Sequence, residues 1–186
     1  MHAYLASFRD LCLFRRGPED IPYSPSLLIA LLVACGVLQV GFNRRDGASP
    51  ALVIGSLIGG LAIVGIVFLL LRGRDKSERF VQTTTVLAAV YLLFDIVTNL
   101  LTLLLPMKEL REHLLSQPTH LPSLTGSQTL VMLAIAALGI WQLCVWVGTL
   151  RRALEIPRAG SVLVFLMLVF VNLIVTAVVA SLIGVA

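Results

Sequence analysis

A single carboxylate lies inside a hydrophobic stretch of the chain, at Asp95 within residues 80–105. An ionised side chain at the centre of a bilayer costs about 2.5–3.5 kcal/mol on insertion scales, so we expect Asp95 to face other helices or a water-filled cavity. Residues three or four apart share one helix face, and polar residues recur on this face one turn to either side of Asp95. With the polar residues of two later hydrophobic segments, the candidate intramembrane site comprises Asp95, Asn99, Tyr91, Asn172 and Gln142.

Two interpretations of this site are open. In the first, Asp95 belongs to a proton- or cation-coupled path, as intramembrane carboxylates do in transporters. In the second, it is a hydrogen-bonded polar lock that holds helices in register. A single acid without a basic or second acidic partner makes a poor relay, and this favours the lock.

No other set of residues predicts catalysis. The chain contains no recognisable nucleophile–base pair, zinc-ligand spacing or phosphate-binding loop, so we predict a protein without enzymatic activity, metal or cofactor. Its cysteines, Cys12, Cys35 and Cys144, are far apart and indicate small apolar residues, not a disulfide framework or metal site. Residues 32–36 resemble the lipid-attachment motif of bacterial lipoproteins. The hydrophobic segment continues past Cys35, however, so lipidation there is only an alternative.

The composition places the chain in a membrane. Of its 186 residues, 58% are hydrophobic and 13% are charged, whereas a soluble domain has about 45–50% apolar and about 25% charged residues. The net charge is +4, but the basic residues form short clusters between hydrophobic runs. Such clusters are typical of cytoplasmic loops beside anionic lipid headgroups, and we therefore expect no nucleic-acid partner.

Five hydrophobic segments are long enough to be membrane-spanning helices. They cover residues 26–42, 51–71, 80–105, 128–150 and 161–184. We predict an all-α integral membrane fold in which these helices form one bundle, over residues 25–186. Residues 1–24 are expected to form a cytoplasmic amphipathic segment and a proline-rich linker, and a second short interfacial helix is expected over residues 107–116.

The second span carries small residues at helical spacing. Gly55 and Gly59 lie one turn apart, with Gly60 beside them. Small residues let helix backbones approach closely, which in lipid replaces the hydrophobic driving force available in water. We therefore assign Gly55, Gly59 and Gly60 to helix packing, and a membrane-protein partner or a second copy of the chain is a further expectation.

Basic residues set the predicted orientation. Most of the 14 Lys and Arg residues fall in the N-terminal segment and in the second and fourth loops. By the positive-inside rule these segments face the cytoplasm, which places the N-terminus inside and the C-terminus outside. The basic residues expected at the membrane surface are Arg72, Arg74, Lys76, Arg79, Arg151 and Arg152.

Three stretches share a pattern with a known family. They are GPEDIP before the first span (17–22), RFVQTTTVLAAVY at the start of the third (79–91) and WVGTLRRALEIPRAGSVLVF around the last loop (146–165). With five closely packed spans, the chain resembles the Yip family, named from Ypt/Rab-interacting proteins, and in particular its compact bacterial members. The resemblance implies a non-enzymatic protein of the bacterial inner membrane that binds other proteins or organises membranes. Two alternatives are a small transporter or channel subunit that uses Asp95, and an accessory subunit of a larger membrane complex.

Overall fold

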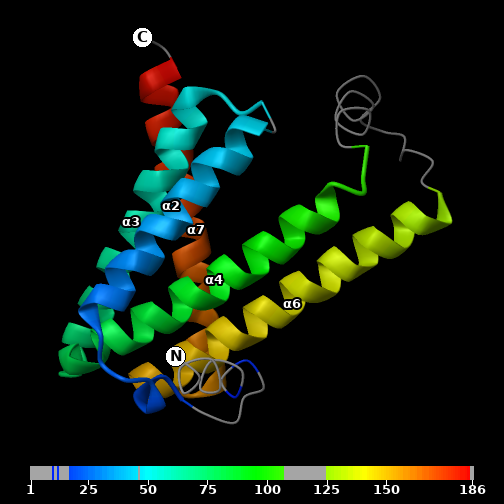
Figure 1. Cartoon of the computed structure of the whole chain (residues 1–186). Coiled ribbons are helices and arrows are strands. Elements are labelled where there is room, and N and C mark those ends of the chain that lie inside the picture. The colour runs from blue at the N-terminus through cyan, green and yellow to red at the C-terminus, as the bar shows by residue number, and fades with distance from the viewer. Residues whose placement is uncertain (1–9, 11, 13–16, 46, 107–124, 185–186) are drawn as a thin grey trace. The chain divides into compact units, whose positions relative to one another are not determined.

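The chain is helical, without strands, over the residues that its computed structural model describes: 10, 12, 17–45, 47–106 and 125–184 (Figure 1). The elements are η1 (Pro18–Asp20), α2 (Pro25–Arg45), α3 (Pro50–Arg72), η2 (Ser77–Arg79), α4 (Phe80–Thr102), α6 (Gly126–Leu154) and α7 (Arg158–Gly184). Five helices are long and apolar enough to cross a membrane, because about 20 apolar residues span the hydrocarbon thickness. The prediction of an all-α, five-span membrane protein is confirmed.

The predicted spans and the observed helices differ at their ends. Most helices extend into the flanking polar residues, as α2 does by continuing to Arg45. α4 instead ends at Thr102, whereas the hydrophobic run predicts a helix to Leu105. The N–H groups of residues 103–105 donate to carbonyls three residues back, at 3.3, 3.0 and 3.1 Å. This tighter winding closes the helix just before Pro106, which has no N–H to continue it.

The two predicted interfacial helices lie mainly outside the described residues. Of the N-terminal segment 1–16, only Asp10 and Cys12 are described, and both are helical. Residues 107–116 fall entirely within an undescribed range. Both helices therefore stay predictions.

The chain divides into two units. The first comprises Met1–Leu92 and Cys144–Ala186, and the second comprises Leu93–Leu143. α2, α3 and α7 belong wholly to the first unit, whereas α4 and α6 contribute residues to both. Within the first unit, α3 lies beside α7 and also contacts α2 (Figure 1).

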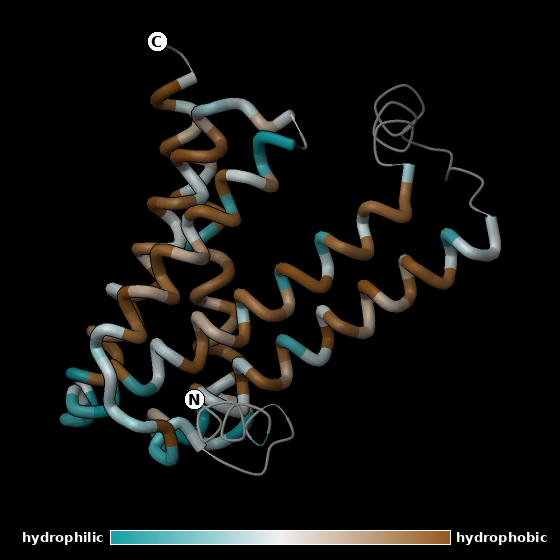
Figure 2. Tube along the Cα trace, viewed as in Figure 1, coloured by the Kyte–Doolittle hydropathy of each residue, from teal (hydrophilic) through white to brown (hydrophobic). Residues whose placement is uncertain are grey.

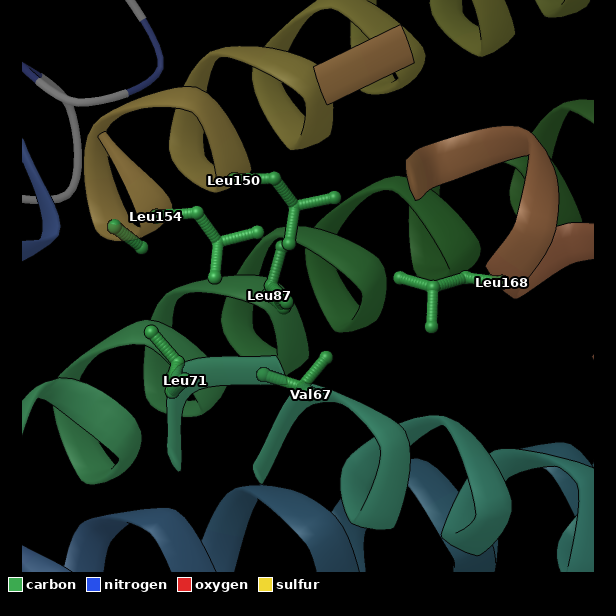
Figure 3. Packing of buried hydrophobic residues seen from close by; sticks show 7 residues of the cluster. Val67, Leu71, Leu87, Leu150, Leu154 and Leu168 are labelled. Atoms are coloured by element: carbon green, nitrogen blue, oxygen red, sulfur yellow. The ribbon is translucent and has the colours of Figure 1, made fainter. Parts of the chain in front are cut away.

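Buried aliphatic side chains join four helices of the first unit. The cluster consists of Val67, Leu71, Leu87, Leu150, Ala153, Leu154 and Leu168, from α3, α4, α6 and α7 (Figure 3). The rings of Trp146 and Phe165 pack edge to face beside it, with centroids 6.2 Å apart. Close packing of this kind excludes lipid as well as water, and it fixes the four helices against one another at this level.

Helices α3 and α6 end in the same kind of turn. The backbone N–H groups of Lys76 and Ile156 each donate to the carbonyl five residues back, at 2.9 and 3.3 Å, which is the pattern of a Schellman helix end. The residue before each donor is left-handed: Asp75 has φ 56° and Glu155 has φ 52°. Glycine is usual at this position, and another residue costs about 1–2 kcal/mol.

Candidate functional site

A largely apolar cavity of about 350 Å³ lies among the helices of the first unit. All five spans contribute to its wall, and its main aliphatic residues are Leu32, Leu57, Leu61, Ile63, Val64, Val67 and Leu87. Gly36 and Gly60 also line it, and their missing side chains leave room. A Cβ placed on Gly60 would meet no atom within 4 Å. The volume falls within the range of ligand pockets, about 300–1,000 Å³.

Two polar side chains in the cavity wall contain an atom without a partner. Within the described part of the chain, Thr84 Oγ1 and Trp146 Nε1 are buried and make no hydrogen bond. Ser56 and Cys35, also in the wall, each donate to a backbone carbonyl, at 2.9 and 3.6 Å. A buried polar group left unpaired costs about 1–3 kcal/mol. A ligand atom that accepted a hydrogen bond at Thr84 or Trp146 would recover part of that free energy.

Gly55 and Gly59 lie where α3 meets α7. A Cβ placed on Gly55 would come within 2.7 Å of the carbonyl oxygen of Thr176, and one on Gly59 would overlap Asn172 Oδ1. The Thr176 hydroxyl also donates to the Gly55 carbonyl oxygen at 3.4 Å. The absence of side chains at these two positions lets the helix backbones approach directly.

Gly60 departs from the packing role predicted for it. One residue further along an α-helix turns a position by about 100°, so Gly60 points away from the α7 contact made by Gly59. It borders the cavity instead, with open space where a side chain would begin. The three glycines therefore divide between a helix contact and a cavity.

Asp95 lies half-buried on α4, in the second unit. Asn99, one turn later, donates its Nδ2 to the Asp95 carbonyl oxygen at 2.8 Å and to Asp95 Oδ1 at 3.2 Å. Thr102 continues the same face by donating its hydroxyl to the Asn99 carbonyl oxygen at 2.8 Å. Among the described residues of the second unit, 93–106 and 125–143, the hydrogen bonds of Asp95 therefore stay on its own helix.

The five residues of the predicted intramembrane site fall in both units. Asp95, Asn99 and Gln142 belong to the second unit, and the structure brings Asp95 and Asn99 together. Tyr91 and Asn172 belong to the first unit, where both line the cavity. The polar face predicted on the third span thus supplies Tyr91 to the cavity and Asp95 to a separate hydrogen-bonded group.

The segment before the first span is fixed to the start of α4. Gln82 donates its Nε2 to the carbonyl oxygen of Ile21 at 2.7 Å and to that of Glu19 at 3.4 Å. Ile21 is 2% exposed, and Asp20 caps the preceding turn by accepting from the Gly17 N–H at 3.0 Å. The proline-rich stretch is therefore an ordered part of the first unit.

Glu155 joins the turn before α7 to the turn after α3. Its carboxylate contacts Lys76 Nζ, and its Oε1 lies 2.9 Å from Arg79 Nη1. These hydrogen-bonded ion pairs, with Lys76 first and Arg79 second, hold the pKa of the Glu155 carboxyl below its ordinary value.

We call the surface formed by residues 17–21, 72–79 and 151–158 the polar end of the first unit. Figure 2 shows the hydrophilic turn between α3 and α4 against the hydrophobic helices. Within the described chain, Arg72, Arg74 and Arg151 are exposed and form no ion pair. Of the basic residues predicted at the membrane surface, Lys76 and Arg79 are thus paired with Glu155, whereas these three arginines are available to a partner.

Sequence reasoning missed the cavity and the two fixed turns. Tyr91 belongs to the polar face predicted on the third span, but nothing in the sequence showed that Trp146 and Cys35 share a cavity with it. Gln82 and Glu155 also lacked a signal, because their partners lie 61 residues (Ile21) and more than 70 residues away along the chain. Such contacts follow from tertiary packing, which local patterns do not encode.

The described residues contain no group of three or more His, Cys, Asp or Glu side chains placed to hold a metal ion. No curated protein and no solved structure matches the chain. The Yip1 domain family matches residues 15–180. This range begins just before the fixed proline-rich segment and covers the first four spans and most of α7, so it includes the cavity, the glycine contact and the polar end. The chain belongs to the Yip1 domain family.

Proposed function

We propose that this protein is a non-enzymatic membrane-organising protein that binds a partner protein through the polar end of its first unit. The observation that carries the proposal is the construction of that end. Three segments distant in sequence are held together there: the Lys76–Glu155 and Arg79–Glu155 ion pairs join two of them, and Gln82, just after residues 72–79, donates a hydrogen bond to Ile21 of the third. A surface fixed in this way is pre-organised, and pre-organisation lowers the conformational cost of binding.

The charges of the polar end fit a location beside the inner leaflet. Arg72, Arg74 and Arg151 are exposed, and each basic residue near an anionic membrane surface contributes about 1 kcal/mol of attraction. With the positive-inside rule, this supports a cytoplasmic N-terminus, a C-terminus outside and residence in a bacterial inner membrane. Anionic headgroups are then a second partner of the same arginines, and they hold the surface at a fixed depth.

Affinity purification from membranes with quantitative mass spectrometry tests the partner. We expect a stoichiometric protein to co-purify with the full chain and to be lost when Arg72, Arg74 and Arg151 are all changed to Glu. The matched control changes the same residues to Lys, which keeps the charge and should retain the partner if charge dominates the contact. Recovery of the same protein with the Glu variant would contradict the proposed surface.

Asp95 supports a second candidate, a proton- or cation-coupled path. Among the described residues of the second unit its carboxylate bonds Asn99, which lies on the same helix, so these contacts do not join two helices. The test is Asp95→Asn in vesicles with a pH-sensitive dye inside. Flux through the wild-type chain that disappears in an equally well assembled variant would favour transport, and absence of flux in both would favour the interaction protein.

A further inference from the structure

We propose that the cavity of the first unit binds the acyl chain of a membrane glycerolipid, with an ester carbonyl as the hydrogen-bond acceptor for Trp146 or Thr84. This site is separate from the polar end and does not depend on the partner proposed there. Four observations on the first unit lead to it: the lining, the opening, the unpaired polar atoms and their depth.

The lining suits hydrocarbon. Leu57, Val64, Leu87 and their neighbours make most of the wall, and Gly36 and Gly60 leave it without side chains at two points. A hydrocarbon chain suits this aliphatic part of the wall, along which water would find few hydrogen-bond partners. An acyl chain is also the apolar group present at the highest concentration around a membrane-spanning helix.

The wall reaches the outer surface of the helices. Leu61 lines the cavity and is 65% exposed, so one side of the cavity adjoins the surface that surrounding lipid covers. A lipid tail can therefore enter sideways from the bilayer without crossing the polar end.

The unpaired polar atoms indicate where the headgroup end of the lipid's acyl chain would lie. Trp146 Nε1 can only donate a hydrogen bond, and the Thr84 hydroxyl can donate or accept one. Both are buried without a partner among the described residues, and Thr84 is 3% exposed. The group they require is an uncharged acceptor oxygen. An ester carbonyl is that group, and it is joined directly to the hydrocarbon chain.

The depth of Trp146 agrees with an ester group. Arg151 is exposed at the end of α6, and five residues at 1.5 Å each place Trp146 about 7.5 Å further into the membrane. The polar layer on each side of the hydrocarbon core is about 5–8 Å thick. Trp146 thus lies at the inner boundary of that layer, where the glycerol esters of a lipid are found.

The test uses the purified full chain in vesicles of phosphatidylethanolamine and phosphatidylglycerol that contain a photoactivatable phospholipid. After illumination and proteolysis, we expect the lipid adduct on cavity-lining peptides of α3 and α4. Gly60→Leu fills the cavity and should reduce this adduct about tenfold or more. Gly65→Leu is the matched control, because Gly65 lies on the same helix with open space beside it but does not line the cavity.

Three results would overturn the proposal. One is an equal adduct in Gly60→Leu and in wild type, and another is an adduct spread evenly over all lipid-facing helices. The third comes from Cys35, which lines the cavity, in a chain carrying Cys12→Ser and Cys144→Ser. Rapid reaction of Cys35 with a charged, membrane-impermeant thiol reagent would show a water-filled space.

If Gly60→Leu fails to fold, competition between lipids for the wild-type chain tests the proposal instead. Ester-linked phospholipid should compete with the photoactivatable lipid about three- to tenfold better than its ether-linked analogue, because the analogue lacks the carbonyl acceptor. The double variant Trp146→Phe with Thr84→Val removes both polar atoms while keeping an aromatic ring and a β-branched side chain in the wall, and it should abolish this preference. Equal competition by ester and ether lipids in the wild-type chain would refute the assigned hydrogen bond.

Discussion

α3 presents Gly55 and Gly59 to α7 and presents Gly60 to the cavity. On the first face a Cβ would strike the backbone of Thr176 at 2.7 Å or the side chain of Asn172, whereas on the second it would meet nothing within 4 Å. The same residue type thus closes a space in one direction and keeps one open in the other. The comparison shows that a small-residue pattern in a membrane helix has two structural meanings, which only the neighbouring helix distinguishes.

The largest expected loss of stability comes from adding a single methyl group on the face of α3 that contacts α7. Gly55→Ala places its Cβ against a backbone carbonyl that cannot rotate away, so α3 and α7 must move apart. We expect a loss of about 1–3 kcal/mol of stability, measured by unfolding in mixed detergent micelles. Unchanged stability would show that the glycine contact is dispensable.

The matching substitution on the cavity face should increase stability, not decrease it. Gly60→Ala adds its methyl group to open space and removes the entropic disadvantage of glycine in a helix. We expect a gain of about 0.5–1 kcal/mol at most, measured under the same conditions. Destabilisation as large as that of Gly55→Ala would remove the distinction between the faces.

A smaller effect tests what the Thr176 hydroxyl adds to the glycine contact. Thr176→Val keeps the shape of the side chain but removes the 3.4 Å hydrogen bond to the Gly55 carbonyl oxygen. Because side-chain hydrogen bonds inside membranes average about 0.6 kcal/mol, we expect a loss of that order. A loss equal to that of Gly55→Ala would mean that hydrogen bonding, not backbone approach, holds α3 to α7.

The smallest effect concerns the polar end, which joins the turn after α3 to the turn before α7. Lys76 and Arg79 lower the pKa of Glu155 in the folded state. The stabilisation that Glu155 gives to the folded chain is therefore fully present above its unfolded-state pKa of about 4.5. It is lost as the pH falls through the lower pKa of the folded state. Glu155→Gln should remove this acid-dependent part of the stability curve, and high salt should weaken it in wild type. Superimposable pH curves for the two chains at low salt would contradict this.

The five spans could be predicted because a bilayer requires about 20 consecutive apolar residues of each one. The end of α4 could not, since residues 103–105 are as apolar as a helix interior and only their backbone hydrogen bonds show the tighter turn. The site divides similarly. Tyr91 and Asp95 were predicted on one face of the third span. Gly59 and Gly60, however, are neighbours of identical type, and hydrophobicity is uniform around α3. No periodicity distinguishes a helix-facing from a cavity-facing glycine when lipid and protein are equally apolar.

The contact between Lys76 and Glu155 offers a chemical handle on the whole first unit. A primary amine and a carboxylate that already touch can be condensed by a carbodiimide into an amide without a spacer, and the carbodiimide takes up the elements of water to become a urea. The product would be a chain closed into a ring from residue 76 to residue 155, with α2 and α3 on one arm and α7 on the other. Such a ring would tie the ends of α3 and α7 covalently, and a single protease cut between residues 76 and 155 would leave the two arms joined.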